Sequence, residues 1–334
     1  MNMKQWVADQ LAAPRKNAMP VLSFPSVQLM GITVAQLISS SDLQSKGMKM
    51  VADRCKTAAA VSMMDLSIEA EAFGAKIRVS DDEVPTVIGA ILQEPEDVEA
   101  LKVPAVGTGR TGLYIEAISK AVKLITDRPV FAGVIGPYSL AGRLIGMTEI
   151  MVNCYEEPEM VTTTLEKVTE FIIKYIKGYK AVGTNGVVIA EPVAGLLSPE
   201  LMVEFSGVYV KRIIDAVQDD TFAVIYHNCG NATFKMTKEI ADIDACGYHF
   251  GDAVNMKEIV EKMPSDVLVM GNVSPAKTFR LGTPELVRTE TLSVMNDCCS
   301  HPNFVISSGC DIPPASSWDN IDAFFAAVEE FYKK

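Results

Sequence analysis

Three stretches of the sequence decide the fold: PVFAGVIGP at residues 129–137, GVVIAEP at 186–192 and FAVIYHNCG at 222–230. Each is a nearly continuous apolar run that ends in Gly, Pro or polar residues, as a parallel strand buried on both faces does. Longer segments of helical period separate them, which is typical of βα units. Five further runs follow the same pattern: MPVLSFP (19–25), VSMMDLS (61–67), ACGYHFG (245–251), VLVMGNVSP (267–275) and FVISSGCD (304–311).

The segments between these runs carry helix-start signals. EPE at 157–159, SPE at 198–200 and TPE at 283–285 each place Pro at the first helical position and Glu in the first turn, and Gly183 fits the end of the first of these helices. Eight alternations of strand and helix predict an α/β fold, a (β/α)8 TIM barrel. An open doubly wound sheet would have fewer strands and usually a Gly-rich phosphate loop, and neither G-x-G-x-x-G nor G-x-x-x-x-G-K-[ST] occurs.

Two parts of the chain exceed a minimal barrel. Residues 1–18 precede the first run and predict an N-terminal helical extension. Residues 74–128, between the second and third runs, are too long for one crossover, so we expect an insertion with a small hairpin and a helix beside the barrel mouth. Because no Gly/Ser-rich or Pro-rich linker interrupts the chain, residues 1–334 are interpreted as a single domain.

The composition narrows the class of protein. With 30 Lys and Arg against 42 Asp and Glu, the net charge of −12 argues against nucleic acid binding. The most apolar stretch, residues 129–147, is interrupted by Gly, Pro and Arg, and the first 19 residues lack the apolar core of a signal peptide, so neither membrane insertion nor secretion is expected. An odd number of cysteines, seven, fits a reducing compartment. These features predict a cytoplasmic protein.

Polar side chains stand where the predicted strands end, which is where barrel enzymes carry their catalytic groups. We expect Asp65 and Glu191 to be catalytic and Tyr138, Asn272 and Ser308 to bind substrate. His249 is either a support for a site or simply a polar residue at a strand end.

A possible metal site lies among these strand ends. His227 and Cys229 share one face because residues i and i+2 of a strand do, and Cys310 ends a strand that meets theirs across the barrel mouth. One nitrogen and two sulfurs suit Zn²⁺, and three protein ligands leave a fourth position open for catalysis. The alternative is a core histidine with inert thiols.

At these residues the sequence resembles the uroporphyrinogen decarboxylase superfamily, and within it the branch of zinc-dependent cobamide methyltransferases. The set His227, Cys229 and Cys310 is similar to the zinc motif of that branch, which the decarboxylases lack. The decarboxylases share an N-terminal segment with Arg for the porphyrinogen carboxylates, whereas AMPVLSFPSVQLMG at 18–31 has no Arg. The stretches that carry the resemblance are MDLSIEAEAFG (64–74), GVIGPYSLAGRLIG (133–146), VVIAEPVAGLLSP (187–199) and MGNVSPAKTFRLGTPELV (270–287).

The resemblance implies a methyltransferase that takes a methyl group from a methylcobamide on a corrinoid carrier protein. The acceptor would be a thiol such as coenzyme M, activated by zinc as the thiolate, or tetrahydrofolate. A sulfonate would need a cation, and only Arg143 and Lys277 stand near the strand ends. Glu191 or Asp65 would fill the fourth zinc position or accept the thiol proton, unless these carboxylates cap a helix or anchor a loop.

Two other classes of function stay open. One is a metal-free decarboxylase of the uroporphyrinogen decarboxylase type. The other is a non-catalytic zinc-stabilised or carrier-binding protein, in which four protein ligands would hold the zinc. The sequence does not settle whether the chain acts alone or as a homodimer.

Overall fold

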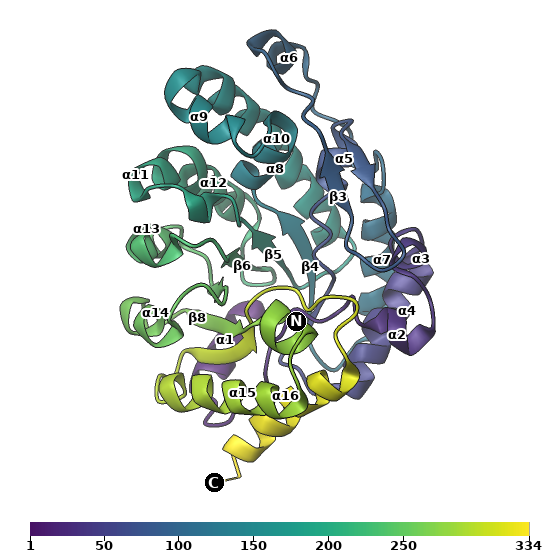
Figure 1. Cartoon of the computed structure of the whole chain (residues 1–334), viewed down its shortest axis with the longest axis vertical. Helices are drawn as coiled ribbons and strands as arrows, with labels where there is room; N and C mark the ends of the chain where they lie inside the picture. Colours follow the sequence, from purple (N-terminus) through teal and green to yellow (C-terminus); the bar gives the residue numbers. More distant parts are fainter. Residues whose placement is uncertain (334) are drawn as a thin grey trace.

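The computed structural model describes residues 1–333. Its centre is a curled sheet of seven strands, each paired in parallel with the next, and helices surround the sheet (Figure 1). This arrangement confirms the predicted α/β fold of the TIM-barrel type. In spatial order the strands are β1 (Ala60–Val61), β4 (Val130–Ile135), β5 (Gly186–Ala190), β6 (Ala223–Asn228), β7 (Gly247–Phe250), β8 (Leu268–Val273) and β9 (Phe304–Ser308).

The helices begin where the sequence signals place them. The three predicted Pro-Glu starts coincide with helices that begin at Pro158, Pro199 and Pro284. The side chains of Ser198 and Thr283 accept hydrogen bonds from backbone N–H groups in the first turns of the second and third of these helices. The outer helices are α4 (Ser41–Arg54), α7 (Thr111–Leu124), α8 (Pro137–Ile145), α9 (Glu149–Glu156), α10 (Pro158–Ala181), α11 (Pro199–Met202), α12 (Val208–Val217), α13 (Thr237–Ala241), α14 (Met256–Lys262), α15 (Pro284–Cys298) and α16 (Trp318–Phe331). Shorter elements are α2 (Ser26–Met30), α3 (Val34–Ile38), 3-10 turns at Ala194–Leu196 and Thr233–Lys235, and π-helical segments at Val203–Gly207 and Pro275–Arg280.

The first predicted strand, residues 19–25, is not a regular strand. The segment lies between β9 and β1 and closes the ring through single backbone hydrogen bonds: Met19 N–H donates to the carbonyl of Ile306 at 3.0 Å, and Ala18 accepts from Ala58 at 2.9 Å. A regular ladder cannot continue here because Pro20 has no N–H to donate.

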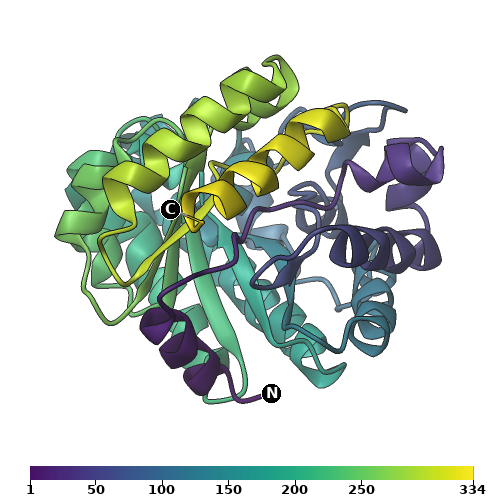
Figure 2. The ribbon, with the colours of Figure 1, turned by 90° about the horizontal axis from the view of Figure 1, so that it is seen from below.

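The inside of the barrel is filled by alternate strand residues and closed at one end by α1 (Met3–Ala12). Ala223 and Ile225 of β6 point inward, and Trp6 of α1 packs on Phe131 with ring centroids 5.8 Å apart. The N–H of Met3 donates to the carbonyl of Asp220, in the loop before β6, so α1 covers the end where the strands begin (Figure 2). The carboxyl ends of the strands are left to build a site.

The insertion after β1 lies beside that open end. It contains α5 (Ile68–Ala72), an antiparallel hairpin of β2 (Lys76–Arg78) and β3 (Thr86–Ile88), and α6 (Pro95–Ala100) before α7 returns to the barrel. Within the predicted bounds of 74–128 the structure has the expected hairpin but two helices, α6 and α7, where one was predicted, because α7 itself forms the crossover to β4. No helix in residues 1–333 is long and apolar enough to cross a membrane.

Candidate metal centre

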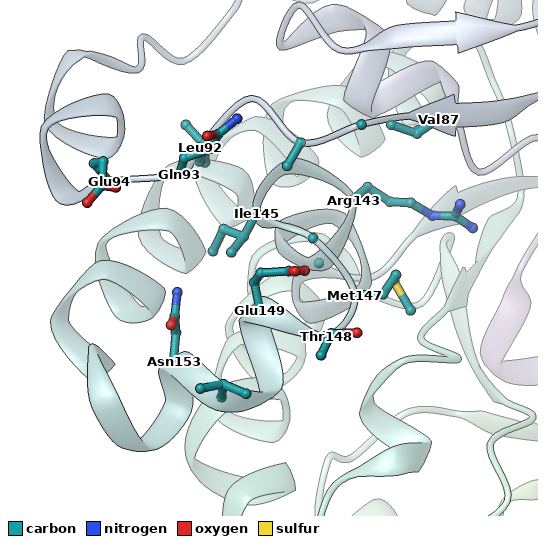
Figure 3. A pocket seen from close by; sticks show the side chains of 15 residues that line it. Val87, Leu92, Gln93, Glu94, Arg143, Ile145, Met147, Thr148, Glu149 and Asn153 are labelled. Carbon is teal, nitrogen blue, oxygen red and sulfur yellow. The ribbon is translucent and has the colours of Figure 1, made fainter.

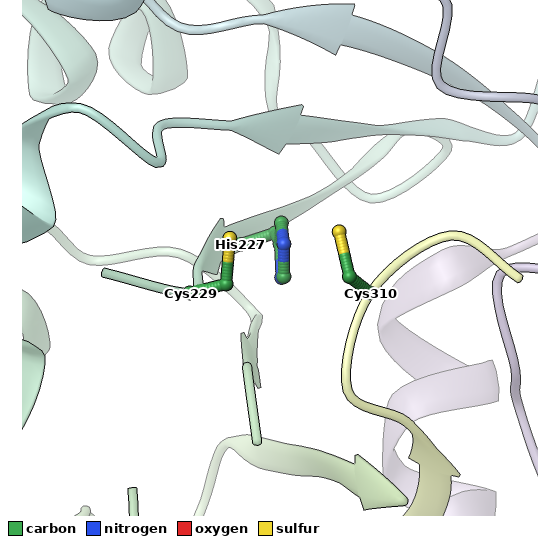
Figure 4. A group of neighbouring side chains, drawn as sticks. All are labelled: His227, Cys229 and Cys310. Atoms are coloured by element: carbon green, nitrogen blue, oxygen red, sulfur yellow. The ribbon is translucent and has the colours of Figure 1, made fainter. Parts of the chain in front are cut away.

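Three potential metal ligands converge at the carboxyl ends of β6 and β9. One ligand atom from each of His227, Cys229 and Cys310 lies within 4.8 Å of the others, and this is the one such group of three or more His, Cys, Asp or Glu side chains within residues 1–333 (Figure 4). Alternate residues of β6 point into the barrel, so His227 points inward as Ile225 does. We call these three residues the His-Cys-Cys cluster.

Close packing under Cys229 fixes the position of its thiol. A Cβ atom added at Gly251, which follows β7, would lie 2.4 Å from the Cβ of Cys229. Any side chain there would push the cysteine away, so glycine is needed at residue 251 for the loop to approach β6 this closely.

Hydrogen bonds behind His227 set which of its nitrogens carries the proton. The Nδ1 atom lies 3.2 Å from the backbone oxygen of His249, which can only accept, and 2.7 Å from Nδ1 of the His249 ring. Ser307 donates its hydroxyl to the carbonyl of Met19 at 2.8 Å, so its oxygen accepts from Nε2 of His249 at 2.7 Å. Nδ1 of His249 is then an acceptor, and His227 carries its proton on Nδ1.

The other nitrogen of His227 is therefore left with a free lone pair. Nε2 is buried and has no hydrogen-bond partner among the described residues. Burial, together with the neighbouring His227, holds the pKa of His249 well below its usual value, which keeps that ring neutral. A buried nitrogen without a partner is uncommon in folded proteins. Its position beside two thiols fits a metal ligand.

The two thiols have opposite pKa shifts. The contact between the two thiols lowers the pKa of Cys229 and raises that of Cys310, and burial raises the pKa of Cys310 further. One imidazole nitrogen and two sulfurs, with no fourth protein ligand among residues 1–333, match the composition of an open zinc site. The donors present thus fit zinc.

Glu191 lies outside the cluster. Its buried carboxylate accepts backbone N–H bonds from Tyr138 at 3.0 Å and Ser139 at 2.6 Å, and the hydroxyl of Ser206 at 3.1 Å. It caps the first turn of α8, and a Cβ at Gly136 would lie 2.5 Å from its carboxyl carbon. Burial raises the pKa of Glu191 to about 7. These contacts favour the alternative role for Glu191, an anchor for the start of α8.

Asp65, the second expected catalytic carboxylate, is fully engaged elsewhere. Its Oδ2 accepts from Arg110 Nη1 and from the hydroxyl of Tyr114, both at 2.6 Å, and its Oδ1 accepts from the backbone N–H and hydroxyl of Ser67. Arg110 also donates to Glu71 at 2.7 Å. We call Asp65, Ser67, Glu71, Arg110 and Tyr114 the Asp65 network. Asp65 is not part of the His-Cys-Cys cluster.

The three expected substrate-binding residues are held by the protein itself. The hydroxyl of Tyr138 lies 3.4 Å from Cys154 Sγ in the core, because Tyr138 belongs to α8 and faces α9. Asn272 donates its amide to the carbonyls of Gly251 and Val254. Ser308 accepts from the N–H of Val21. Each therefore holds part of the barrel mouth together through these contacts.

Two residues of the site were missed from the sequence. Arg110 lies in the insertion, where no strand pattern pointed to it. Ser307 is the inward-facing serine of β9, since Val305 two residues earlier points inward. Counting the alternation from Val305 would have selected Ser307 rather than Ser308.

The chain belongs to the uroporphyrinogen decarboxylase (URO-D) family, whose model matches residues 14–331. The methylcobamide:CoM methyltransferase MtbA of Methanosarcina acetivorans is 29% identical over 274 residues, 80% of this chain and 78% of the relative. The uroporphyrinogen decarboxylase of Ruthia magnifica is 24% identical over 293 residues, 84% of this chain and 83% of that protein. The family match and the methyltransferase relative confirm the predicted resemblance and the predicted enzyme class, a methyltransferase.

A solved structure has the same fold. A methyltransferase from Methanosarcina mazei superposes with a TM-score of 0.87 at 22% identity and covers 99% of both chains. At this level of identity the likeness concerns the fold.

Proposed function

We propose that this protein transfers a methyl group from a methylated corrinoid to a thiol, with zinc held by the His-Cys-Cys cluster. The observation that carries the proposal is the unpaired, buried Nε2 of His227 beside two thiols at the barrel mouth. The methyltransferase relative, named for a methylcobamide and CoM, supports the donor and makes coenzyme M the first acceptor to test.

Each residue of the cluster has a defined task in this proposal. His227 would bind zinc through Nε2, and Cys229 and Cys310 would bind it as thiolates. A zinc ion bound there supplies a Lewis acid that favours the thiolate form of an acceptor thiol at neutral pH. His249 and Ser307 hold the ring of His227 in the required tautomer. Glu191 and Asp65 support the surrounding loops.

The donor would reach the open end of the barrel on a carrier protein. Large apolar side chains are exposed in the loops that follow the strands there: Leu196 after β5 is 45% exposed, Phe234 after β6 is 46% exposed and Leu281 after β8 is 77% exposed. Exposed apolar residues clustered on one face are typical of protein-binding surfaces. We expect this face to contact a corrinoid carrier.

The first experiment is the zinc content of anaerobically purified protein, compared with Cys310→Ser. We expect about one zinc per chain in the wild type and a large loss in the variant, because a tetrahedral site cannot hold zinc well with two protein ligands. Cys299→Ser is the matched control, since Cys299 is also a partly buried thiol but lies outside the cluster. Protein kept reduced and free of chelators that contains no zinc would overturn the proposed site.

The second experiment measures methyl transfer from methylcobalamin to coenzyme M, other thiols and tetrahydrofolate, with uroporphyrinogen as a separate substrate. Transfer to a thiol that requires zinc supports the proposal. Transfer to tetrahydrofolate alone would refute thiol activation, and decarboxylation of uroporphyrinogen without metal would assign the chain to the decarboxylase alternative.

A further inference from the structure

A second cleft lies at the end of the barrel where the strands begin. It has a volume of about 420 Å³ and is lined by residues 15–18, residues 54–56 and the C-terminal half of α16. The chain after α1 passes α16 there (Figure 2). Ala18 and Met19 make the single backbone hydrogen bonds that close the ring. A ligand in this cleft would contact both sides of that closure.

Cations outnumber acids in the lining of this cleft. Its charged residues are Arg15, Lys16, Arg54, Lys56, Asp322 and Glu329, and we call it the basic cleft. Asp322 is already paired with Arg54. Glu329 is paired with Lys333, at 3.7 Å. The other three cations form no ion pair within residues 1–333. In a chain with a net charge of −12, this is a local site of positive potential.

Lys16 is the buried member of the three unpaired cations. Only 8% of the residue is exposed, and in the described part of the chain its ammonium makes one hydrogen bond, to the carbonyl of Ala13 at 2.9 Å. Burial raises the pKa of the neighbouring Cys299 to about 11, so that thiol is neutral at pH 7 and supplies no counter-ion. An ammonium has three N–H donors, and a buried charge without a counter-ion is costly. An anion in the cleft would supply the missing partner.

The other two unpaired cations lie at the surface of the basic cleft. The guanidinium of Arg15 lies over the ring of Tyr332, 5.8 Å from its centroid, which orients the group and leaves its N–H edge available. Lys56 is exposed on the segment before β1. Phe325 and Val328 of α16 add apolar lining. The cleft therefore combines donors from two segments with an apolar wall.

A larger cleft between the insertion, α8 and α9 lacks this excess of cations. It has a volume of about 800 Å³, and its charged lining residues are Glu94, Glu149 and Arg143 (Figure 3). Two carboxylates against one guanidinium disfavour a ligand with several negative charges. Such a ligand is better matched by the basic cleft.

We propose that the basic cleft binds a small molecule with a pyrophosphate group, either inorganic pyrophosphate or a nucleoside diphosphate. The phosphate oxygens accept from Lys16 and Lys56 as point charges and from the planar fork of Arg15. The volume of the cleft suits a ligand of this size. Because the ligand joins the segment before the ring closure to α16 and to the segment before β1, its binding stabilises the closed barrel. This site lies apart from the methyl-transfer site and does not depend on it.

Calorimetry on the zinc-loaded protein tests this with pyrophosphate, ADP and adenosine. We expect pyrophosphate and ADP to bind and adenosine not to bind. Tighter binding of ADP would assign the site to a nucleotide whose base contacts Phe325, and equal or tighter binding of pyrophosphate would assign it to the inorganic anion. Failure of both to bind at about 1 mM, or binding of adenosine alone, would overturn the proposal.

Exposed substitutions locate the binding. Arg15→Gln and Lys56→Gln should each weaken binding of pyrophosphate about 3- to 10-fold, because each removes a charge-assisted hydrogen bond. Lys46→Gln is the matched control, since Lys46 is an exposed lysine of α4 outside the cleft, and it should bind as the wild type does. Pyrophosphate should also raise the Tm of the wild type more than that of Arg15→Gln. Equal binding by all four proteins, which extraction of zinc by pyrophosphate would also produce, would overturn the site.

Discussion

The two sides of the barrel mouth are built in opposite ways. In the Asp65 network, Asp65 accepts four hydrogen bonds and the guanidinium of Arg110 donates to two carboxylates, so that the charges are paired. In the His-Cys-Cys cluster, Nε2 of His227 is buried and unpaired. Since buried polar groups are normally hydrogen-bonded, we interpret the paired Asp65 network as structural support and the unpaired His-Cys-Cys cluster as a ligand site.

Arg110 and Arg143 show the same contrast between a paired and an unpaired group. Substituting them should give the largest expected difference in the free energy of unfolding. Arg110→Met leaves Asp65 buried without its cation, so we expect the free energy of unfolding to fall by about 3–5 kcal/mol. Arg143→Met removes no hydrogen bond, and its unfolding free energy should stay equal or rise. Urea unfolding of both variants measures the difference, and equal destabilisation by the two substitutions would contradict it.

The support behind His227 can be tested by removing the His249 ring, the nearer of the two acceptors for its Nδ1 proton. We expect His249→Phe to weaken zinc binding about 10- to 100-fold, measured by competition with a chelator, because the ring of His227 is then free to turn or change tautomer. His249→Gln keeps an oxygen that can accept and should recover part of the affinity.

The control for this prediction is His301→Gln, because His301 lies in the turn before β9 and outside the cluster. Zinc affinity unchanged in His249→Phe would show that packing and the backbone oxygen of residue 249 are enough to orient His227.

The cluster was predictable because it follows from two simple regularities. Strand residues alternate, so His227 and Cys229 share a face, and barrel closure brings the end of β6 near that of β9. His249 could not be assigned because its contact depends on the register of β6 and β7, which pairs it with His227. Nothing in the local sequence fixes that register.

The structure holds the other strand-end residues in contacts within the protein for a common physical reason. A strand end tells where a side chain starts but not whether it turns toward the axis or toward the helices. Glu191 turns to the start of α8, Tyr138 turns to Cys154 of α9, and Ser308 turns to Val21. In each case the polar group that was expected to meet a substrate contacts a backbone N–H group or lies in the core.

Glu69 makes the stability of this side of the molecule depend on pH. It is a buried carboxyl near the Asp65 network, and one of its oxygens has no hydrogen-bond partner. Burial raises its pKa to about 8. Protonated Glu69 therefore stabilises the fold below the unfolded-state pKa of a glutamate, and this contribution is lost as the pH rises toward about 8.

We expect the unfolding free energy to fall by about 1 kcal/mol between pH 6 and 7 through this group. Urea unfolding across this range should show a smaller slope in Glu69→Gln, which stays neutral at every pH. The same slope in both proteins would place the pH dependence elsewhere, for example at Glu191.

The smallest expected effect distinguishes the two ends of the barrel. Leu281 is 77% exposed at the open end, whereas Leu124 is 46% exposed at the end of α7, on the side where the strands begin. If a carrier protein docks at the open end, Leu281→Ser should raise the KM for carrier-bound methylcobamide about 3- to 10-fold, because one apolar contact of the interface is lost. Leu124→Ser should not change it. Neither substitution should alter the KM for free methylcobalamin, since that small molecule needs no protein surface, and a change there in Leu281→Ser would mean that this residue touches the corrinoid itself.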